Sequence, residues 1–138
     1  MASAAFGVYA FYMTIQTVKK AGAHFAEVVC TGEYSMTAFL GMLDDALDFA
    51  ASQDHSAVLV DALAVTGGPD LEERVNLAAS GADLQLGKDR LVAIAIVGEE
   101  PMLHPERIGE AVALDRCAIL KVFESRDAAV QWLEHTSG

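Results

Sequence analysis

Four residues in the middle of the chain have types and a spacing that suit binding or regulatory chemistry. Asp61 follows the apolar run Ala57–Val60, Thr66 and Gly67 come shortly after it, and Arg74 lies downstream. Ligands of open α/β sheets gather at the carboxyl ends of the strands, and helix N-termini favour anions. The pattern therefore predicts a regulatory or ligand-binding loop formed by Asp61, Thr66, Gly67 and Arg74.

Each of these residues also has a structural explanation, which the sequence leaves open. Asp61 can accept hydrogen bonds from amides of its own turn, and Thr66 can cap the following helix. Arg74 can pair with Asp61 or reach a ligand. Thr66 can also serve as a phosphorylation site, where helix-end amides would favour the phosphate and the neighbouring acidic residues would oppose it.

The other candidate motifs do not indicate catalysis. The segment 81–89 is one residue too long for a phosphate-binding loop, and no Ser or Thr follows Lys88. The histidines are scattered without a metal-binding spacing, and no serine lies in a nucleophile elbow. Cys30 and Cys117 fit no metal spacing and are expected to be buried thiols. We expect no enzymatic activity, no metal and no cofactor.

Composition narrows the classes of partner. With 138 residues the chain is expected to form a single domain, residues 1–138. The net charge of −11 argues against nucleic-acid binding. Lys and Arg are absent from residues 21–73, so this acidic stretch can attract a basic protein partner or simply keep the surface soluble. No signal or membrane-spanning segment is recognised, which predicts a cytoplasmic protein without membrane insertion.

The hydrophobic fraction of 53% exceeds what one small sheet is expected to cover, and residues 1–13 are strongly apolar. A two-fold homodimer is the commonest way to bury such a surplus. We therefore expect self-association.

Periodicity and breaker residues predict a mixed, mostly parallel sheet that starts with a hairpin and is covered by helices. The expected order is β-β-α-β-α-β-α-β-α. In the helix expected at 69–86, Leu71, Val75, Ala78 and Ala82 are predicted to face inward. Ser35 and Ser125 are predicted helix caps. The expected strands are 8–18, 25–31, 57–61, 91–97 and 118–123, with a polar turn at 19–22, and the expected helices are 35–52, 69–86, 105–116 and one that starts at Ser125.

This order resembles the STAS domain of sulfate transporters and anti-sigma-factor antagonists, and in particular the small stand-alone bacterial members of uncharacterised function. The resemblance extends over nearly the whole chain. In the antagonists an Asp after the central strand is followed by Asp-Ser-Ser-Gly, whose serine is phosphorylated. Here Asp61 matches the first position, and Thr66-Gly67 falls near the second without the Asp or either Ser. The matching segments are Val58-Leu59-Val60-Asp61, 65–69, Glu73-Arg74, 91–97, 108–116 and 122–133.

The resemblance implies a non-enzymatic, STAS-like regulatory or interaction domain that acts as a protein-partner switch at the loop after Asp61. The alternative is a module that binds a small apolar or anionic ligand, as the related CRAL-TRIO-like proteins do. An acidic surface beside the loop would favour the protein partner, whereas a lined apolar cavity would favour the ligand.

Overall fold

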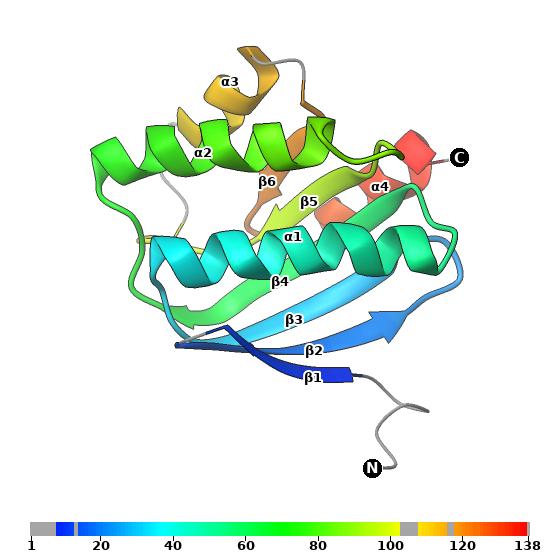
Figure 1. Ribbon diagram of the computed structural model, residues 1–138, viewed down its shortest axis with the longest axis horizontal. Helices are drawn as coiled ribbons and strands as arrows, with labels where there is room; N and C mark the ends of the chain where they lie inside the picture. Colours follow the sequence, from blue (N-terminus) through cyan, green and yellow to red (C-terminus); the bar gives the residue numbers. More distant parts are fainter. Residues whose placement is uncertain (1–7, 13, 103–107, 116–117, 138) are drawn as a thin grey trace.

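The computed structural model describes residues 8–12, 14–102, 108–115 and 118–137. Six strands form one sheet, and helices cover both of its faces (Figure 1). The elements are β1 (Val8–Tyr12), β2 (Ile15–Ala21), β3 (Ala26–Glu33), α1 (Met36–Ser52), β4 (Ala57–Thr66), α2 (Leu71–Leu86), β5 (Ala93–Val97), α3 (Ile108–Asp115), β6 (Leu120–Phe123) and α4 (Arg126–Ser137).

The strands follow one another across the sheet in chain order, β1-β2-β3-β4-β5-β6. The first two pairings are antiparallel, and the pairings from β3 to β6 are parallel. Each parallel pairing is joined by a helix, as a crossover connection requires. The predicted fold class, a mostly parallel α/β sheet with an antiparallel N-terminal part, is confirmed.

The N-terminal part contains one strand more than predicted. The strand expected at 8–18 is two antiparallel strands, β1 and β2, and Tyr12 pairs with Ile15 across their turn. The residues expected to form a polar turn, 19–22, mostly belong to β2. Lys19 is buried there and pairs with Asp45 of α1, which explains how a charged residue can occupy a covered strand. The turn lies instead at Gly22–Phe25, where the Gly22 amide donates to the Phe25 carbonyl.

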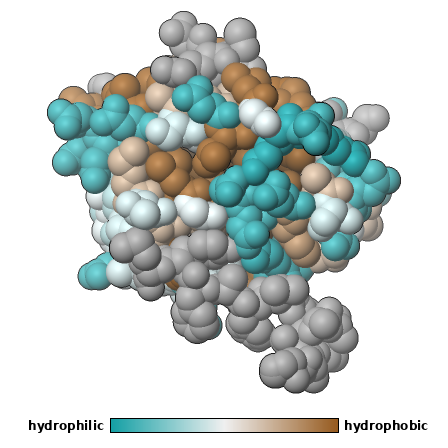
Figure 2. Space-filling view, in the orientation of Figure 1, coloured by the Kyte–Doolittle hydropathy of each residue, from teal (hydrophilic) through white to brown (hydrophobic). Residues whose placement is uncertain are grey.

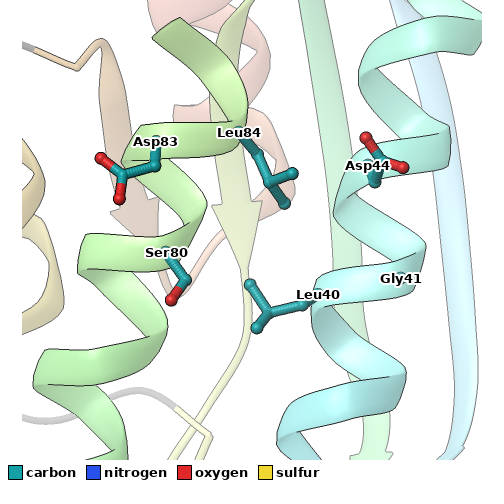
Figure 3. A pocket seen from close by; sticks show the side chains of 6 residues that line it. All are labelled: Leu40, Gly41, Asp44, Ser80, Asp83 and Leu84. Atoms are coloured by element: carbon teal, nitrogen blue, oxygen red, sulfur yellow. The ribbon is translucent and has the colours of Figure 1, made fainter. Parts of the chain in front are cut away.

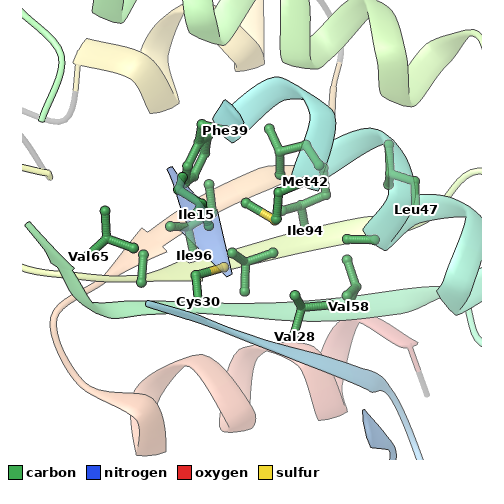
Figure 4. Close-up of a cluster of buried hydrophobic side chains, with 14 of the residues drawn as sticks. Ile15, Val28, Cys30, Phe39, Met42, Leu47, Val58, Val65, Ile94 and Ile96 are labelled. Carbon is green, nitrogen blue, oxygen red and sulfur yellow. The ribbon is translucent and has the colours of Figure 1, made fainter. Parts of the chain in front are cut away.

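Side-chain alternation along β4 and β5 divides the core between the two faces of the sheet. Val58, Val60 and Ile94 pack beneath α1 and α2, in the larger cluster seen in Figure 4. Leu59 and Ala95 pack on the opposite face against Leu133 of α4. Successive residues of a strand point to opposite faces, so the continuous apolar runs belong to strands that are covered on both sides.

The first helix forms as its sequence predicts. The Ser35 hydroxyl accepts a hydrogen bond from the Ala38 amide at 3.1 Å, so Ser35 is the N-cap. The acidic residues Asp44 and Asp48 in the C-terminal half of α1 are both paired with Lys88, which follows α2. These ion pairs offset the unfavourable position of the two carboxylates near the negative end of the helix dipole.

The second helix presents a different face to the core from the one predicted. Ala78 and Ala82 are buried as expected, but the side chains of Leu71 and Val75 are 60% and 41% exposed. The buried face is formed by Leu77, Ala78, Gly81, Ala82 and Gln85. The helix also begins two residues later than predicted, because Asp70 caps it through a 2.8 Å bond from the Glu73 amide and Pro69 precedes the cap.

Towards the C-terminus, strand β5 is entirely buried and begins at Ala93 instead of residue 91. Pro105, at the start of the third predicted helix, lies outside the described residues, and Ala111 of α3 is exposed. The Ser125 hydroxyl accepts from the Ala128 amide at 3.4 Å, which supports its predicted cap. Trp132 is half-buried and its ring lies 5.8 Å from that of Phe123.

Candidate functional site

Strand β4 places the predicted site residues at two separate positions. It pairs with β5 as far as Asp61, which lies opposite Val97, and then continues beside β3 alone as far as Thr66, opposite Glu33. Asp61 is therefore in the middle of a long strand, not at its carboxyl end as predicted. Four residues of strand lie between it and Thr66, so the two Cα atoms are about 16 Å apart.

Asp61 has a structural task at an irregularity of the sheet. The register between β3 and β4 shifts near this residue, and the Asp61 carboxylate accepts a hydrogen bond from the Leu63 amide at 3.1 Å. This is the local bonding that the sequence left open as one explanation. Asp61 also influences two neighbours: the pKa of Arg126 is raised by hydrogen bonds to Glu27 and further by Asp61, and the pKa of Cys30 is raised to about 12 by burial and then by the Asp61 charge.

Thr66 ends the strand and does not cap α2. Its hydroxyl donates to the Gly32 carbonyl at 3.1 Å, and its own carbonyl accepts from the Tyr34 amide at 2.9 Å. Both bonds join it to the end of β3. The cap that the sequence suggested for Thr66 is supplied by Asp70. The Thr66 side chain is nevertheless exposed at the surface.

Two glycines let the chain turn from β4 into α2. Gly67 has a φ of +77°, a backbone conformation that residues with a side chain rarely adopt. At Gly68 a Cβ atom would lie 2.3 Å from the Pro101 carbonyl oxygen, so only glycine allows this close approach. The loop at 66–70 is thus packed directly against the segment that follows β5.

Arg74 holds that same segment from the side of α2. Its guanidinium donates to the Met102 carbonyl at 3.0 Å and to the Pro101 carbonyl at 2.5 Å. Arg74 therefore binds these two carbonyls, and not Asp61, which the sequence also allowed as a partner. Thr66, Gly67 and Arg74 therefore gather around one loop junction, and Asp61 lies apart from them.

Tyr34 belongs to this junction and was not identified from the sequence. Its ring lies 6.3 Å from that of Phe39, and its buried hydroxyl oxygen has no hydrogen-bond partner among the residues that the structure describes. The pKa of Tyr34 is raised to about 12 by burial and by the negative charge of Glu73 and Asp70, with Arg74 acting in the opposite direction. The phenol therefore remains neutral at physiological pH and supports the loop as a packing residue.

Two exposed apolar residues of α2 lie soon after the loop. Leu71 and Val75 are one helical turn apart and so share one side of the helix, which we call the Leu71/Val75 face. The sequence pattern placed these side chains in the core, because their spacing is the same whether a stripe is buried or exposed. The sequence did contain one indication that this side of the helix is exposed, because Glu72 and Glu73 lie between Leu71 and Val75.

Exposed carboxylates lie on the segments that meet at the loop and at the start of α2, and we call them the acidic rim. Asp70 and Glu72 belong to the start of α2, Glu33 pairs with Thr66 in the sheet, and Glu99 and Glu100 precede the Pro101 segment. Figure 2 shows hydrophilic side chains gathered over the N-terminal end of α2, at the left of the view. The site is thus an apolar pair of residues beside a strongly negative surface.

A groove of about 480 Å³ lies between α1 and α2. Leu40 and Leu84 point toward each other across it, as Figure 3 shows, and Asp44 and Asp83 stand at its sides. The described residues contain no group of three or more His, Cys, Asp or Glu that could hold a metal ion. Within the same residues, no helix has the length and apolar character needed to cross a bilayer.

Comparison with known proteins identifies the fold. No protein-family model and no curated protein sequence matches this chain. Its structure is similar to the crystal structure of an anti-sigma factor antagonist from Mycobacterium paratuberculosis, with a TM-score of 0.56 and 17% sequence identity. The alignment covers 88% of this chain and 95% of that one. The STAS-like fold that the sequence resemblance implied is confirmed by this likeness.

Proposed function

We propose that this chain is a STAS-like regulatory domain that binds a protein partner with a basic and partly apolar surface. The partner would bind the loop at 66–70 together with the Leu71/Val75 face. The observation that carries the proposal is the exposure of two apolar side chains beside a loop held by specific backbone contacts. Apolar surface rimmed by polar groups is typical of protein interaction sites.

The charge around the face indicates the partner's chemistry. The acidic rim supplies carboxylates from three segments, and the guanidinium of Arg74 is bound to the Pro101 and Met102 carbonyls. A basic surface would be attracted to this rim and would approach faster at low ionic strength, because salt screens exposed charges beyond about 8–10 Å. The partner complex should therefore weaken as the salt concentration rises.

The structural comparison supports a role through another protein. The similar protein from Mycobacterium paratuberculosis is named as an antagonist of an anti-sigma factor. A non-catalytic role in the cytoplasm belongs to the same proposal. The alternative of a bound small ligand would use the groove between α1 and α2. Leu40 and Leu84 point into that groove, which favours an apolar ligand there over an anionic one.

The proposal is tested with a double variant, Leu71→Ser with Val75→Ser. Its control is Leu86→Ser, which changes an exposed leucine (48%) at the other end of α2. Exposed substitutions of this kind change the free energy of unfolding by only about 0.5 kcal/mol each. Each immobilised protein is mixed with a lysate of the source organism, and the captured proteins are quantified by mass spectrometry at low and high salt.

We expect a basic protein to be captured by the native chain and by Leu86→Ser at low salt. The double variant should capture it about tenfold less, which corresponds to about 1.4 kcal/mol. Thr66→Glu adds negative charge to the rim and should increase capture relative to Thr66→Ala, as a switch at this residue requires. Equal capture by the double variant and the control would refute the proposed surface. Equal capture by the two Thr66 variants would remove Thr66 as the switch.

A further inference from the structure

Strand β1 forms one edge of the sheet. Its neighbour is β2, and it stands at the end of the strand order. An edge strand carries a row of backbone amides and carbonyls that can pair with another strand, and proteins commonly protect such edges with charge, proline or a covering segment. The sequence of β1, Val-Tyr-Ala-Phe-Tyr, contains neither charge nor proline.

The hydrogen bonds of β2 indicate which backbone groups of β1 face outward. The Thr14 carbonyl accepts from the Glu33 amide, and the Gln16 carbonyl accepts from the Thr31 hydroxyl, so residues 14 and 16 face β3. Because backbone groups alternate in direction along a strand, residues 15, 17 and 19 face β1.

The partners of residues 15, 17 and 19 in β1 are Tyr12, Ala10 and Val8. The backbone groups of Tyr9 and Phe11 therefore face away from β2, on the side where no other described strand lies.

We propose that β1 pairs with β1 of a second copy of this chain, antiparallel and with the two-fold axis at Ala10. In this register Tyr9 lies opposite Phe11 of the second copy, and their outward amides and carbonyls form a hydrogen-bonded pair. Ala10 lies opposite Ala10 of the second copy in the closer, non-hydrogen-bonded type of pair, which a small residue suits. The two sheets become continuous across the axis.

The sequence of the strand favours a second copy as the occupant. About the axis at Ala10 an aromatic residue is matched with an aromatic residue, and Val8 is matched with Tyr12. Aromatic–aromatic and aromatic–β-branched pairs are the favourable cross-strand combinations. The sequence of β1 is therefore complementary to a second β1 that is related to it by a two-fold rotation about Ala10.

The opposite edge of the sheet does not offer the same surface. Strand β6 has four residues, carries the exposed Lys121, and is flanked by α3 and α4. A head-to-tail pairing of β1 with β6 would also build an open fibre, whereas β1 with β1 closes as a dimer. Strands β2 and β3 separate β1 from β4, so the dimer leaves the loop at 66–70 accessible.

Charge substitutions at residues 9 and 11 test both the dimer and its register. Tyr9→Glu with Phe11→Glu, and Tyr9→Lys with Phe11→Lys, place like charges in both cross-strand pairs. Tyr9→Lys with Phe11→Glu places opposite charges in the same pairs. Within one chain these positions pair with Val18 and Gln16, which are uncharged, so the three variants differ little in their own sheet. The comparison of the two like-charged variants also separates local repulsion from the net charge of −11.

Sedimentation velocity at micromolar concentrations measures the dimer, and circular dichroism verifies the fold of each variant. We expect the native chain and the oppositely charged variant to be dimeric. Both like-charged variants should dissociate at least about tenfold more readily, because like charges directly opposite each other destabilise a strand pair. A monomeric native chain would overturn the proposal, and so would three variants that dimerise equally.

Discussion

Gln85→Leu is expected to destabilise the protein, because Gln85 joins α2 to the starts of two strands. The side chain is 1% exposed. Its amide nitrogen donates to the Val92 carbonyl at 2.7 Å and to the Ile119 carbonyl at 2.8 Å. Its amide oxygen accepts from the Ile119 amide at 2.7 Å. A leucine of similar size fills the space but forms none of these bonds.

The magnitude follows from the groups that lose their partner. The Ile119 carbonyl keeps a 3.0 Å bond from the Ile94 amide, so its loss is small. The Val92 carbonyl and the Ile119 amide lose the bonds that Gln85 makes, and a buried unsatisfied backbone group costs about 1–3 kcal/mol. The apolar leucine recovers part of this. We expect the free energy of unfolding to fall by about 2–4 kcal/mol.

Urea unfolding followed by the fluorescence of Trp132, the single tryptophan, measures this change. Asn76→Leu is the control, because Asn76 is exposed on the same helix and should shift the free energy of unfolding by less than about 0.5 kcal/mol. A loss below about 1 kcal/mol for Gln85→Leu would refute the assigned role of the three bonds.

A glutamate at the same position adds a test by pH. In Gln85→Glu the introduced carboxylate would face the Val92 and Ile119 carbonyls without a proton to donate. Burial and these carbonyls raise the pKa of the introduced carboxyl group above its unfolded value of about 4.3. The variant should therefore be most stable below that value and lose stability as the pH rises toward neutrality. A stability loss that is independent of pH would contradict this bonding pattern.

Two further predictions concern Trp132 of α4 and Cys30 of β3. Trp132→Ala should lower the free energy of unfolding by about 2 kcal/mol, because the half-buried ring packs on Phe123. A fully buried tryptophan would cost about 3–5 kcal/mol. An unchanged midpoint in urea unfolding, followed by circular dichroism, would contradict this prediction. Burial raises the pKa of Cys30 to about 12, so in a Cys117→Ser background this thiol should resist iodoacetamide at mildly alkaline pH. It should react once urea unfolds the chain. Rapid labelling of the folded protein would be inconsistent with the burial of Cys30.

Local sequence determined most of the elements, although the strand predicted at 8–18 is two strands and β4 extends beyond residue 61 to Thr66. The Ser35 cap and the regular apolar spacing of α1 depend on residues within a turn or two, so they can be recognised without the rest of the fold. The uninterrupted apolar run of β5 likewise marks a strand that is covered on both faces. These features, together with their order, were sufficient to predict a mostly parallel sheet with helices on it.

Tertiary structure decided the site. Periodicity shows that α2 has apolar stripes but not which one is buried. In the folded chain α2 packs against α1 and α3, and its buried face is formed by Leu77, Ala78, Gly81, Ala82 and Gln85. This packing turns Leu71 and Val75 to the surface.

Long-range contacts likewise decided the bonds that local sequence could not. Arg74 binds a carbonyl 28 residues away at Met102, and Thr66 binds one 34 residues away at Gly32. Neither partner could be recognised locally, because the free energy of such contacts depends on segments that only the folded chain brings together.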